Sequence, residues 1–394
     1  MPAQASTPAA APPPPPALRA LRDRIDAIDR ELVELLARRN EVVREVASVK
    51  RATGFPVRDA GREAALLADR ASLAADRDLR PEVVESLFRV VLWASRDRQA
   101  ALGASLREDL PVRTVAVVGA GGGIGGLFAG LLEDLGQRVL RVDRDTALDG
   151  PAAARQADAV LVAVPMDVTE DVISAIGPHV REGGLMLDVT SVKAGPVAAM
   201  LGATEGRGVD VVGTHPLFGP SVHSLQGQRI VLCPARVDRA RGWDDWLGGL
   251  LSARGLVAIE TDPVHHDRVM SVVQVLTHHA TETLGLTLAR LGVPVDETLR
   301  FTSPVYLMEL MMSARHFAQS AGLYRSIQAS NPETERVAAT FRAAAEDLAA
   351  AVSADDRERF AALFAEARTA FGDFSERALE TSSFLIDRLV ERTD

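Results

Sequence analysis

The chain has 394 residues, of which 47% are apolar and 25% are charged, a balance typical of a protein with two or three folded domains. Its formal net charge of −10 argues against nucleic acid or an anionic membrane as a partner, because both bind basic surfaces. Its single cysteine, Cys233, excludes an internal disulfide and a cysteine-based metal site, and predicts a cytoplasmic protein.

Residues 1–17 are rich in proline and alanine and are expected to form a disordered tail. This segment has neither the basic part nor the apolar part of a signal peptide. No later run approaches the roughly 18 consecutive apolar residues of a membrane-spanning helix, so no membrane segment is predicted.

Residues 18–106 predict an all-helical domain of three helices. Apolar residues recur at helical spacing from Leu18 to Val49 with no Gly or Pro between them. Asp59 is placed to cap a second helix, and Pro81 opens a third. A first helix this long exposes apolar surface along its length, so a partner chain is expected to cover it.

Basic residues on the first helix form a candidate anion site. Arg39 and Lys50 lie 11 residues apart, which on an ideal helix places them near one face and about 16 Å from each other. Arg22 precedes Arg39 by 17 residues, or about 25 Å of helix, so it cannot reach the same ligand and would have to serve another chain. From spacing alone, a solvated charged face on a dimerising helical hairpin is the alternative.

Residues 18–105, with "ALRDRIDAIDRELVELLARRN" and "SRDRQ", resemble the all-helical (AroQ-type) chorismate mutases. The resemblance implies rearrangement of chorismate to prephenate, in which the protein holds a folded dicarboxylate and stabilises charge on the ether oxygen. It also implies that arginines grip the carboxylates and that Lys50 and Gln99 donate to the ether oxygen. The matching site residues are Arg22 from the partner subunit, Arg39, Lys50, Asp59, Glu63, Ser95 and Gln99.

After a short linker at residues 107–112, the pattern changes to that of a Rossmann-type domain at residues 113–262. Buried-strand runs alternate with helices, which predicts a doubly wound, mostly parallel sheet. The expected strands cover the run "TVAVV" and residues 138–143, 159–165, 185–190, 209–216 and 228–234. From residue 263 to 394 helical spacing returns, with breaks near 292–294 and 331–332, and predicts a third, all-helical domain.

A glycine-rich turn follows the first expected strand and opens a helix, as in dinucleotide-binding proteins. Two registers fit: Gly121, Gly123 and Gly126 match the fingerprint literally, whereas Gly119, Gly121 and Gly125 match it with one inserted residue. Asp143 ends the next strand, where a carboxylate accepts the ribose 2′-hydroxyl of NAD. The sequence therefore favours NAD, with Arg144 leaving NADP as an alternative, and the candidate cofactor residues are Gly119, Gly121, Gly122, Gly125 and Asp143.

His215 lies just past a strand, at the carboxyl edge of the sheet where ligands bind in this fold. Its surroundings in "THPLFGP", together with "LDVTSVKAGP", "HHDRVM" and "ARHFAQ", resemble the prephenate dehydrogenases. With the mutase-like region, residues 18 to about 380 resemble the bifunctional chorismate mutase/prephenate dehydrogenases. The likeness implies that His215 is the catalytic histidine, that Ser191 orients it or the substrate, that Arg315 holds a carboxylate, and that His278 and, less directly, His266 lie near the substrate.

Two lysines, Lys50 and Lys193, stand among the 44 Lys and Arg residues. Lys193 is a candidate for the dehydrogenase site, either steadying a carboxylate or capping local structure. The resemblance implies two linked activities, with chorismate and prephenate as substrates, NAD as cofactor and a homodimer with shared mutase sites. The alternatives are a prephenate or arogenate dehydrogenase whose helical region serves only dimerisation or regulation. No metal-ligand spacing is present, so no metal is expected.

Overall fold

The computed structural model describes residues 15–53, 55, 57–104, 110–222 and 224–390. It divides into two compact units, the first comprising residues 1–110, 223–228 and 249–256, and the second residues 111–222, 229–248 and 257–394. Most of the expected tail, residues 1–14, and residues 107–109 of the expected linker lie outside the described residues. Within the described residues, no helix is long and apolar enough to cross a membrane.

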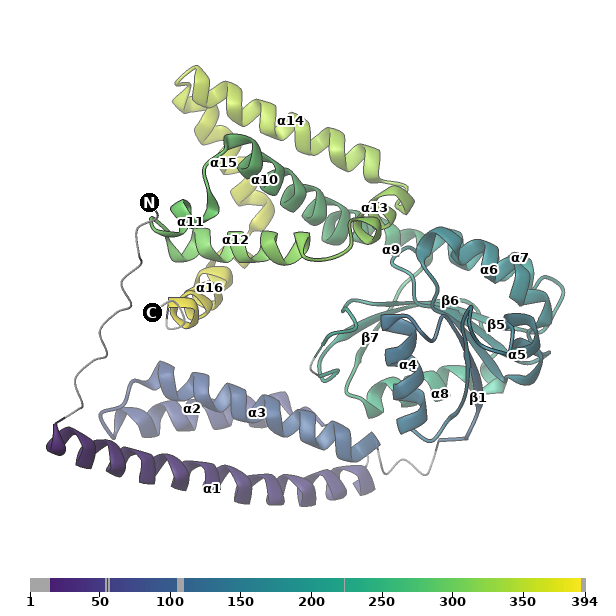
Figure 1. Ribbon diagram of the computed structural model, residues 1–394, viewed down its shortest axis with the longest axis horizontal. Coiled ribbons are helices and arrows are strands. Elements are labelled where there is room, and N and C mark those ends of the chain that lie inside the picture. Colours follow the sequence, from purple (N-terminus) through teal and green to yellow (C-terminus); the bar gives the residue numbers. More distant parts are fainter. Residues whose placement is uncertain (1–14, 54, 56, 105–109, 223, 391–394) are drawn as a thin grey trace, which may run out of the picture. The chain divides into compact units, whose positions relative to one another are not determined.

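The described part of residues 15–104 in the first unit forms the helices α1 (Pro16–Thr53), α2 (Ala60–Ala75) and α3 (Pro81–Ala104). Figure 1 shows α1 as one uninterrupted helix, and α3 packs against both α1 and α2. Asp59 caps α2 by accepting a hydrogen bond from the Arg62 N–H at 3.0 Å, which satisfies a free donor at the helix start. The helical pattern of the sequence therefore predicted the elements of this unit.

The second unit is built on one sheet with strand order β2-β1-β3-β4-β5-β6-β7. All neighbouring strands are parallel except β5 and β6, which run antiparallel. The sequence did not indicate this reversal or the short last strand. The strands are β1 (Thr114–Val118), β2 (Arg138–Val142), β3 (Ala159–Val162), β4 (Leu185–Asp188), β5 (Asp210–Pro216), β6 (Arg229–Arg236) and β7 (Val257–Glu260).

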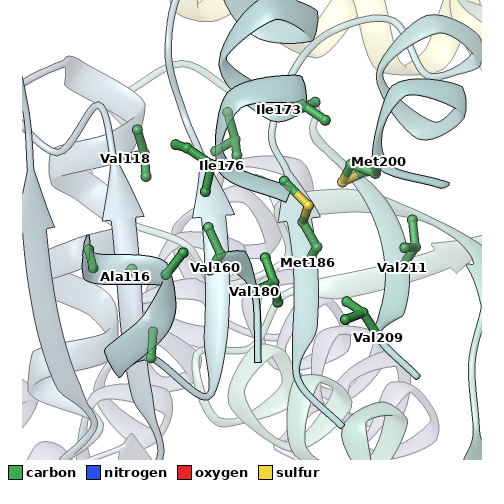
Figure 2. Close-up of a cluster of buried hydrophobic side chains, with 14 of the residues drawn as sticks. Ala116, Val118, Val160, Ile173, Ile176, Val180, Met186, Met200, Val209 and Val211 are labelled. Atoms are coloured by element: carbon green, nitrogen blue, oxygen red, sulfur yellow. The ribbon is translucent and has the colours of Figure 1, made fainter. Parts of the chain in front are cut away.

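Helices cover both faces of this sheet, as a buried parallel sheet requires. One face of the sheet carries Ala116, Val160, Met186 and Val211, which alternate along their strands with residues of the other face. These side chains pack on helices that supply Ile173 and other apolar side chains (Figure 2). The covering elements are α4 (Gly123–Asp134), α5 (Gly150–Gln156), α6 (Thr169–Ile176), α7 (Ala194–Ala203) and α8 (Trp243–Ala253), with 3₁₀ turns η1 (Met166–Val168), η2 (Gly177–His179) and η3 (Arg239–Arg241).

Helices alone form the rest of the second unit, which confirms the helix, sheet, helix order expected from the sequence. A π-helical segment, η4 (Ser271–Leu276), joins the first two of them, and such segments are frequent at functional sites. The helices are α9 (Pro263–Met270), α10 (Thr277–Leu291), α11 (Val295–Leu299), α12 (Pro304–Phe317), α13 (Ala321–Ser330), α14 (Thr334–Ser353), α15 (Arg357–Phe371) and α16 (Phe374–Val390).

Candidate active sites

His215 is the centre of a buried chain of hydrogen bonds at the carboxyl edge of the sheet. It lies near the end of β5 with 2% of its surface exposed. Its Nδ1 is 2.8 Å from Nε2 of His266, and Nδ1 of His266 is 2.8 Å from Oδ1 of Asp267. The helix α9 thus brings two residues to a histidine on the sheet, more than 50 positions earlier in the chain.

Asp267 is held as a carboxylate at the far end of this chain. Its oxygens accept hydrogen bonds from the backbone N–H groups of Lys193 at 2.7 Å and of Ala194 at 2.9 Å. Although burial alone would raise the pKa of Asp267, the hydrogen bonds from His266, Ala194 and Lys193 lower it. An ionised Asp267 accepts the Nδ1–H of His266, so Nε2 of His266 is left to accept from His215.

The order of donors leaves Nε2 of His215 as the acceptor nitrogen of the ring. Nδ1 of His215 carries its proton toward His266, and Nε2 is 3.2 Å from Nε2 of Gln274, an amide donor on the π-helical segment. Burial, and then the neighbouring His266 and Lys193, hold the pKa of His215 well below its usual range. His215 is therefore a neutral imidazole with an acceptor nitrogen, as a general base requires.

Ser191 follows β4 at the same edge of the sheet but forms no hydrogen bond with His215 in this structure. The orientation of His215 is set by His266 and Gln274 instead. The sequence reasoning missed Asp267 and Gln274. Both could have been identified from the sequence. Asp267 adjoins His266 in "HHD", and Gln274 follows Asp267 by two helical turns.

Lys193 is fully buried at the ends of β4 and β5. Its side chain forms an ion pair with Asp188, and its Nζ also donates to the carbonyl of Thr214 at 2.7 Å and to Oγ1 of Thr190 at 3.3 Å. Thr190 and Asp188 lie at the end of β4, and Thr214 is next to His215 on β5. The contacts of the Lys193 side chain in this structure are thus with neighbouring residues of β4 and β5.

His278 and Arg315 lie on α10 and α12 of the C-terminal helices. The ring of His278 contacts those of Tyr324 and His316 at centroid distances of 4.8 and 5.4 Å, and its Nδ1 is buried without a hydrogen-bond partner. Burial, and then His316, lower the pKa of His278. A cavity of about 500 Å³ adjoins this aromatic group and is lined by Glu282, His316, Phe317, Gln319, Ala321, Tyr324, Arg325, Gln328 and Ala329.

The glycine-rich turn lies between β1 and α4, at the point where the strand order reverses between β1 and β3. Gly119 adopts a φ of +91°, and a Cβ there would meet the carbonyl oxygen of Ala163 at 2.5 Å. A Cβ at Gly125 would meet the Gly119 carbonyl oxygen at 2.1 Å. Gly119 and Gly125 thus occupy the turn and helix-packing positions of the inserted register.

Asp143, just after β2, closes this turn. Its carboxylate accepts the Gly121 N–H and the Arg144 N–H, each at 2.8 Å. These hydrogen bonds, from Arg144 first and Gly121 second, lower the pKa of Asp143. An ionised carboxylate beside a backbone without a side chain fits the ribose and pyrophosphate of NAD.

In the helical unit, Arg39, Ser95 and Gln99 are brought together between α1 and α3. The guanidinium of Arg39 donates to Oγ of Ser95, and Nε2 of Gln99 donates to the Ser95 carbonyl at 3.2 Å. Oε1 of Gln99 is buried without a hydrogen-bond partner. Burial lowers the pKa of Arg39. An orphaned buried amide oxygen next to an arginine marks a polar pocket rather than a packed core.

The remaining candidates of this unit lie at the end of α1 and the start of α2. Nζ of Lys50 donates to the Val57 carbonyl at 2.8 Å, and Glu63 accepts from Arg96 of α3 at 2.7 Å. Asp59 caps α2. Arg22 lies near the other end of α1 and joins none of these residues, as its distance along the helix predicted.

Taken together, a Rossmann-type sheet with a buried neutral histidine at its carboxyl edge defines a nicotinamide-dependent dehydrogenase. It is joined to a helical unit in which Arg39 lies beside the buried polar residues Ser95 and Gln99. Matches to family profiles agree with this class. Residues 21–100 match chorismate mutase type II, residues 137–245 the prephenate dehydrogenase nucleotide-binding domain, and residues 262–366 the prephenate dehydrogenase dimerization domain.

Known proteins with the same combination cover almost the whole chain. A T-protein of Haemophilus influenzae is 32% identical over 373 residues, which is 94% of this chain and 97% of that protein. One of Enterobacter agglomerans is 34% identical over 370 residues, with the same coverage of 94% and 97%. The chain therefore belongs to the T-protein family.

It is a bifunctional enzyme of tyrosine biosynthesis, a chorismate mutase and an NAD-dependent prephenate dehydrogenase. The helical region is thus more than the dimerisation or regulatory module of the alternative hypothesis. A solved structure of prephenate dehydrogenase from Aquifex aeolicus shares the fold, with a TM-score of 0.53 and 19% identity over 67% of this chain and 98% of that one. Within the described residues, no group of three or more His, Cys, Asp or Glu side chains could hold a metal ion.

Proposed function

We propose that His215 is the general base of the dehydrogenase reaction and that its hydrogen bond to His266 carries this role. The C4 hydroxyl of prephenate takes the place of Gln274, a weak donor whose amide nitrogen lies 3.2 Å from Nε2 of His215. Nε2 then takes the hydroxyl proton while the hydride leaves C4. When bound, NAD⁺ supplies the hydride acceptor. Loss of the ring carboxylate as CO2 makes the ring aromatic, and the product is 4-hydroxyphenylpyruvate.

The positive charge that develops on His215 is stabilised by the residues that are hydrogen-bonded to it in series. As Nε2 gains a proton, the Nδ1–H bond to His266 strengthens, and the Asp267 carboxylate stabilises the pair through His266. Burial keeps the base neutral before the reaction. This arrangement holds the transferred proton on Nε2 of His215 and excludes water from the hydrogen bonds that join His215, His266 and Asp267.

For substrate binding, we propose that Arg315 grips the side-chain carboxylate of prephenate as a bidentate donor and that His278 lines the same pocket. For His278, the support is its unpartnered Nδ1 and its ring contacts with His316 and Tyr324, which line the adjoining cavity. The assignment of Arg315 rests on its match to the family motif. Ser191, which is not bonded to His215, then serves the substrate rather than the histidine. His266 acts by fixing His215.

For the cofactor, we propose that Gly119, Gly121, Gly122 and Gly125 approach the pyrophosphate and that Asp143 accepts the ribose hydroxyl. The positive φ of Gly119 and the close approach of Gly125 to its carbonyl support this register. The nucleotide-binding profile begins at residue 137, so this assignment rests on the geometry of the turn.

For the mutase reaction, we propose that Arg39 and Arg22 of a second chain grip the carboxylates of chorismate, while Lys50 and Gln99 donate to the ether oxygen. The Gln99 nitrogen must then release the Ser95 carbonyl, a long bond at 3.2 Å. The reaction is unimolecular, so these residues act by holding the folded conformer and stabilising charge. Ser95, Asp59 and Glu63 complete the pocket.

We further propose a homodimer in which two α1 helices share the mutase sites. Apolar residues along α1 are half exposed in the single chain, with Leu21, Ile25 and Ile28 exposed by 52%, 56% and 57%. Covering them with a second chain removes this surface from water and delivers Arg22 to the partner's pocket. A cytoplasmic location remains a prediction from the single cysteine.

Two assays on the purified protein test these activities. It should consume chorismate without cofactor, and reduce NAD⁺ when given prephenate. Arogenate differs from prephenate by an amino group in place of the keto oxygen, and the mutase unit of the same chain makes prephenate. We therefore expect a higher kcat/KM with prephenate than with arogenate. The reverse ratio would contradict the substrate assignment while leaving the mutase assay intact.

A further inference from the structure

Lys193 is a buried lysine for which the proposed mechanism has no use. None of its side chain is exposed, and all three ammonium protons have acceptors, in Asp188, Thr190 and the Thr214 carbonyl. Removing such a charge from water is costly, so a buried lysine persists only where its contacts are needed. These contacts tie the end of β4 to the end of β5.

The backbone of the same residue reaches the other end of the catalytic chain. The Lys193 N–H donates to Oδ1 of Asp267 at 2.7 Å, and Oδ1 is the atom that His266 also contacts. Its side chain holds the carbonyl of Thr214, the residue before His215, at 2.7 Å. One residue therefore fixes both the base and the carboxylate that orients it.

We propose that Lys193 is a positioning residue for the dehydrogenase reaction, which holds His215 and Asp267 at the separation that the His266 bridge requires. The proposal rests on the proposed role of His215. A displacement of about 1 Å in a catalytic group is enough to cost about 10²-fold in rate. Lys193 touches neither substrate nor cofactor in this role.

The packing around Lys193 leaves little freedom for its stem. A Cβ added at Gly213 would meet Cγ2 of Val197 at 2.6 Å and Cδ of Lys193 at 3.1 Å, so β5 carries a glycine where the lysine passes. The ionisable groups around the ammonium are Asp188 on β4, Cys233 on β6, Asp267 on α9 and His215 on β5. Burial lowers the pKa of Lys193, and Asp188 opposes that shift.

A pH profile separates positioning from general support of the fold. The Lys193 ammonium adds to the burial and to His266 in lowering the pKa of His215. Lys193→Met alone removes it while Asp188 stays, so the pKa of His215 should rise and the acid limb of kcat/KM for prephenate should move to higher pH. Mere loss of stability would lower the amount of active enzyme without moving that limb.

Two variants test the proposal at different severity. Lys193→Met with Asp188→Asn removes both charges of the buried pair, and Thr190→Val loosens the ammonium without removing it. We expect kcat to fall about 10–100-fold in the double variant and about 3–10-fold in Thr190→Val. The dissociation constant of NAD⁺ should stay within about twofold in both, because its turn lies on β1 and β2.

Thr204→Val is the matched control, since it removes a buried hydroxyl at the opposite end of α7 that donates to the Met200 carbonyl at 2.6 Å. Its kcat and acid limb should stay unchanged. A wild-type kcat in Thr190→Val or in a folded double variant, or an unmoved acid limb in a folded Lys193→Met variant, overturns the proposal. So does a kcat loss matched by an equal loss of NAD⁺ affinity. If the double variant does not fold, Thr190→Val decides alone. A His215→Asn enzyme that kept full activity would instead refute the proposed base.

Discussion

Nδ1 of His215 and Nε2 of His266 lie 2.8 Å apart, and this contact decides which nitrogen of His215 is free to react. Asp267 accepts the Nδ1–H of His266, so the Nε2 of His266 that faces His215 carries only a lone pair. Asp267, which lies beyond His266 in this chain of hydrogen bonds, thus sets the tautomer of His215. The same logic of base and orienting acceptor operates in unrelated hydrolase triads, although the reaction here is an oxidation.

Substitutions at His266 should separate its hydrogen bond from its bulk. In His266→Gln the side-chain oxygen is able to accept the Nδ1–H of His215, whereas in His266→Phe no acceptor remains. We expect kcat for prephenate oxidation to fall about 10–100-fold in His266→Phe and by less than about tenfold in His266→Gln. Steady-state rates at saturating NAD⁺ measure both.

Chorismate mutase activity in the same His266 variants is the internal control and should be unchanged, because its residues lie in the other compact unit. Equal kcat values for the Gln and Phe variants would show that His266 contributes bulk and not a hydrogen-bond acceptor.

Replacement of the base itself should cost more. His215→Asn keeps a polar side chain of smaller size but has no group that titrates near neutral pH. We expect dehydrogenase turnover to fall about 10²–10⁴-fold while mutase turnover is retained. Prephenate affinity, measured by equilibrium binding, should change little. Parallel loss of both activities would indicate misfolding instead of a missing base.

Dehydrogenase activity should persist at unusually low pH. The neutral form of His215 is the active one, and burial lowers the pKa of His215 well below 6.5. Activity is lost only when the falling pH reaches this lowered pKa of His215. The value of kcat/KM should therefore be constant from about pH 8 to below 6.5. A profile of kcat/KM for prephenate measures this. Half-maximal activity at or above pH 6.5 would contradict the assignment.

Asp143 should determine the cofactor. Asp143→Asn keeps the shape but removes the charge that accepts the Gly121 N–H and that we propose to accept the ribose hydroxyl. We expect the KM for NAD⁺ to rise about 10–100-fold, since a hydrogen bond to a charged group contributes about 1.5–3 kcal/mol. The KM for prephenate should stay the same. An unchanged KM for NAD⁺ would move the ribose contact elsewhere.

Helical spacing was sufficient to predict the three N-terminal helices, and buried-strand runs predicted six of the seven strands of the sheet. The short β7 was missed because Val257–Glu260 adjoins polar residues and is largely exposed, so it lacks the buried pattern of a central strand. The antiparallel direction of β6 was not predicted, because strand direction depends on the connection and not on local composition.

In the active site, residue types indicated His215 and His266 but not the contact between them. That contact requires α9 to pack on the end of β5, which no local pattern specifies. Lys193 shows the same limit, since its place in the sequence was compatible with a ligand role. Only the packing of β4 and β5 around it shows that all its donors are used inside the protein.

The shared mutase site gives a test that needs two inactive enzymes. Arg22→Ala and Arg39→Ala should each lower kcat/KM for chorismate by about 10²-fold, since each removes charged hydrogen bonds to a carboxylate. A mixed dimer of the two variants has one pocket with both arginines, from the Arg39 of one chain and the Arg22 of the other.

Random mixing in equal amounts makes about half of the dimers mixed, each with one of its two sites intact. Unfolding the two variants together and refolding them should therefore restore about a quarter of the wild-type mutase activity. Refolding each variant alone is the control and should restore none. A mixture that never exceeds the average of its two parents would show that Arg22 serves no partner site, and the long α1 would then dimerise for stability alone.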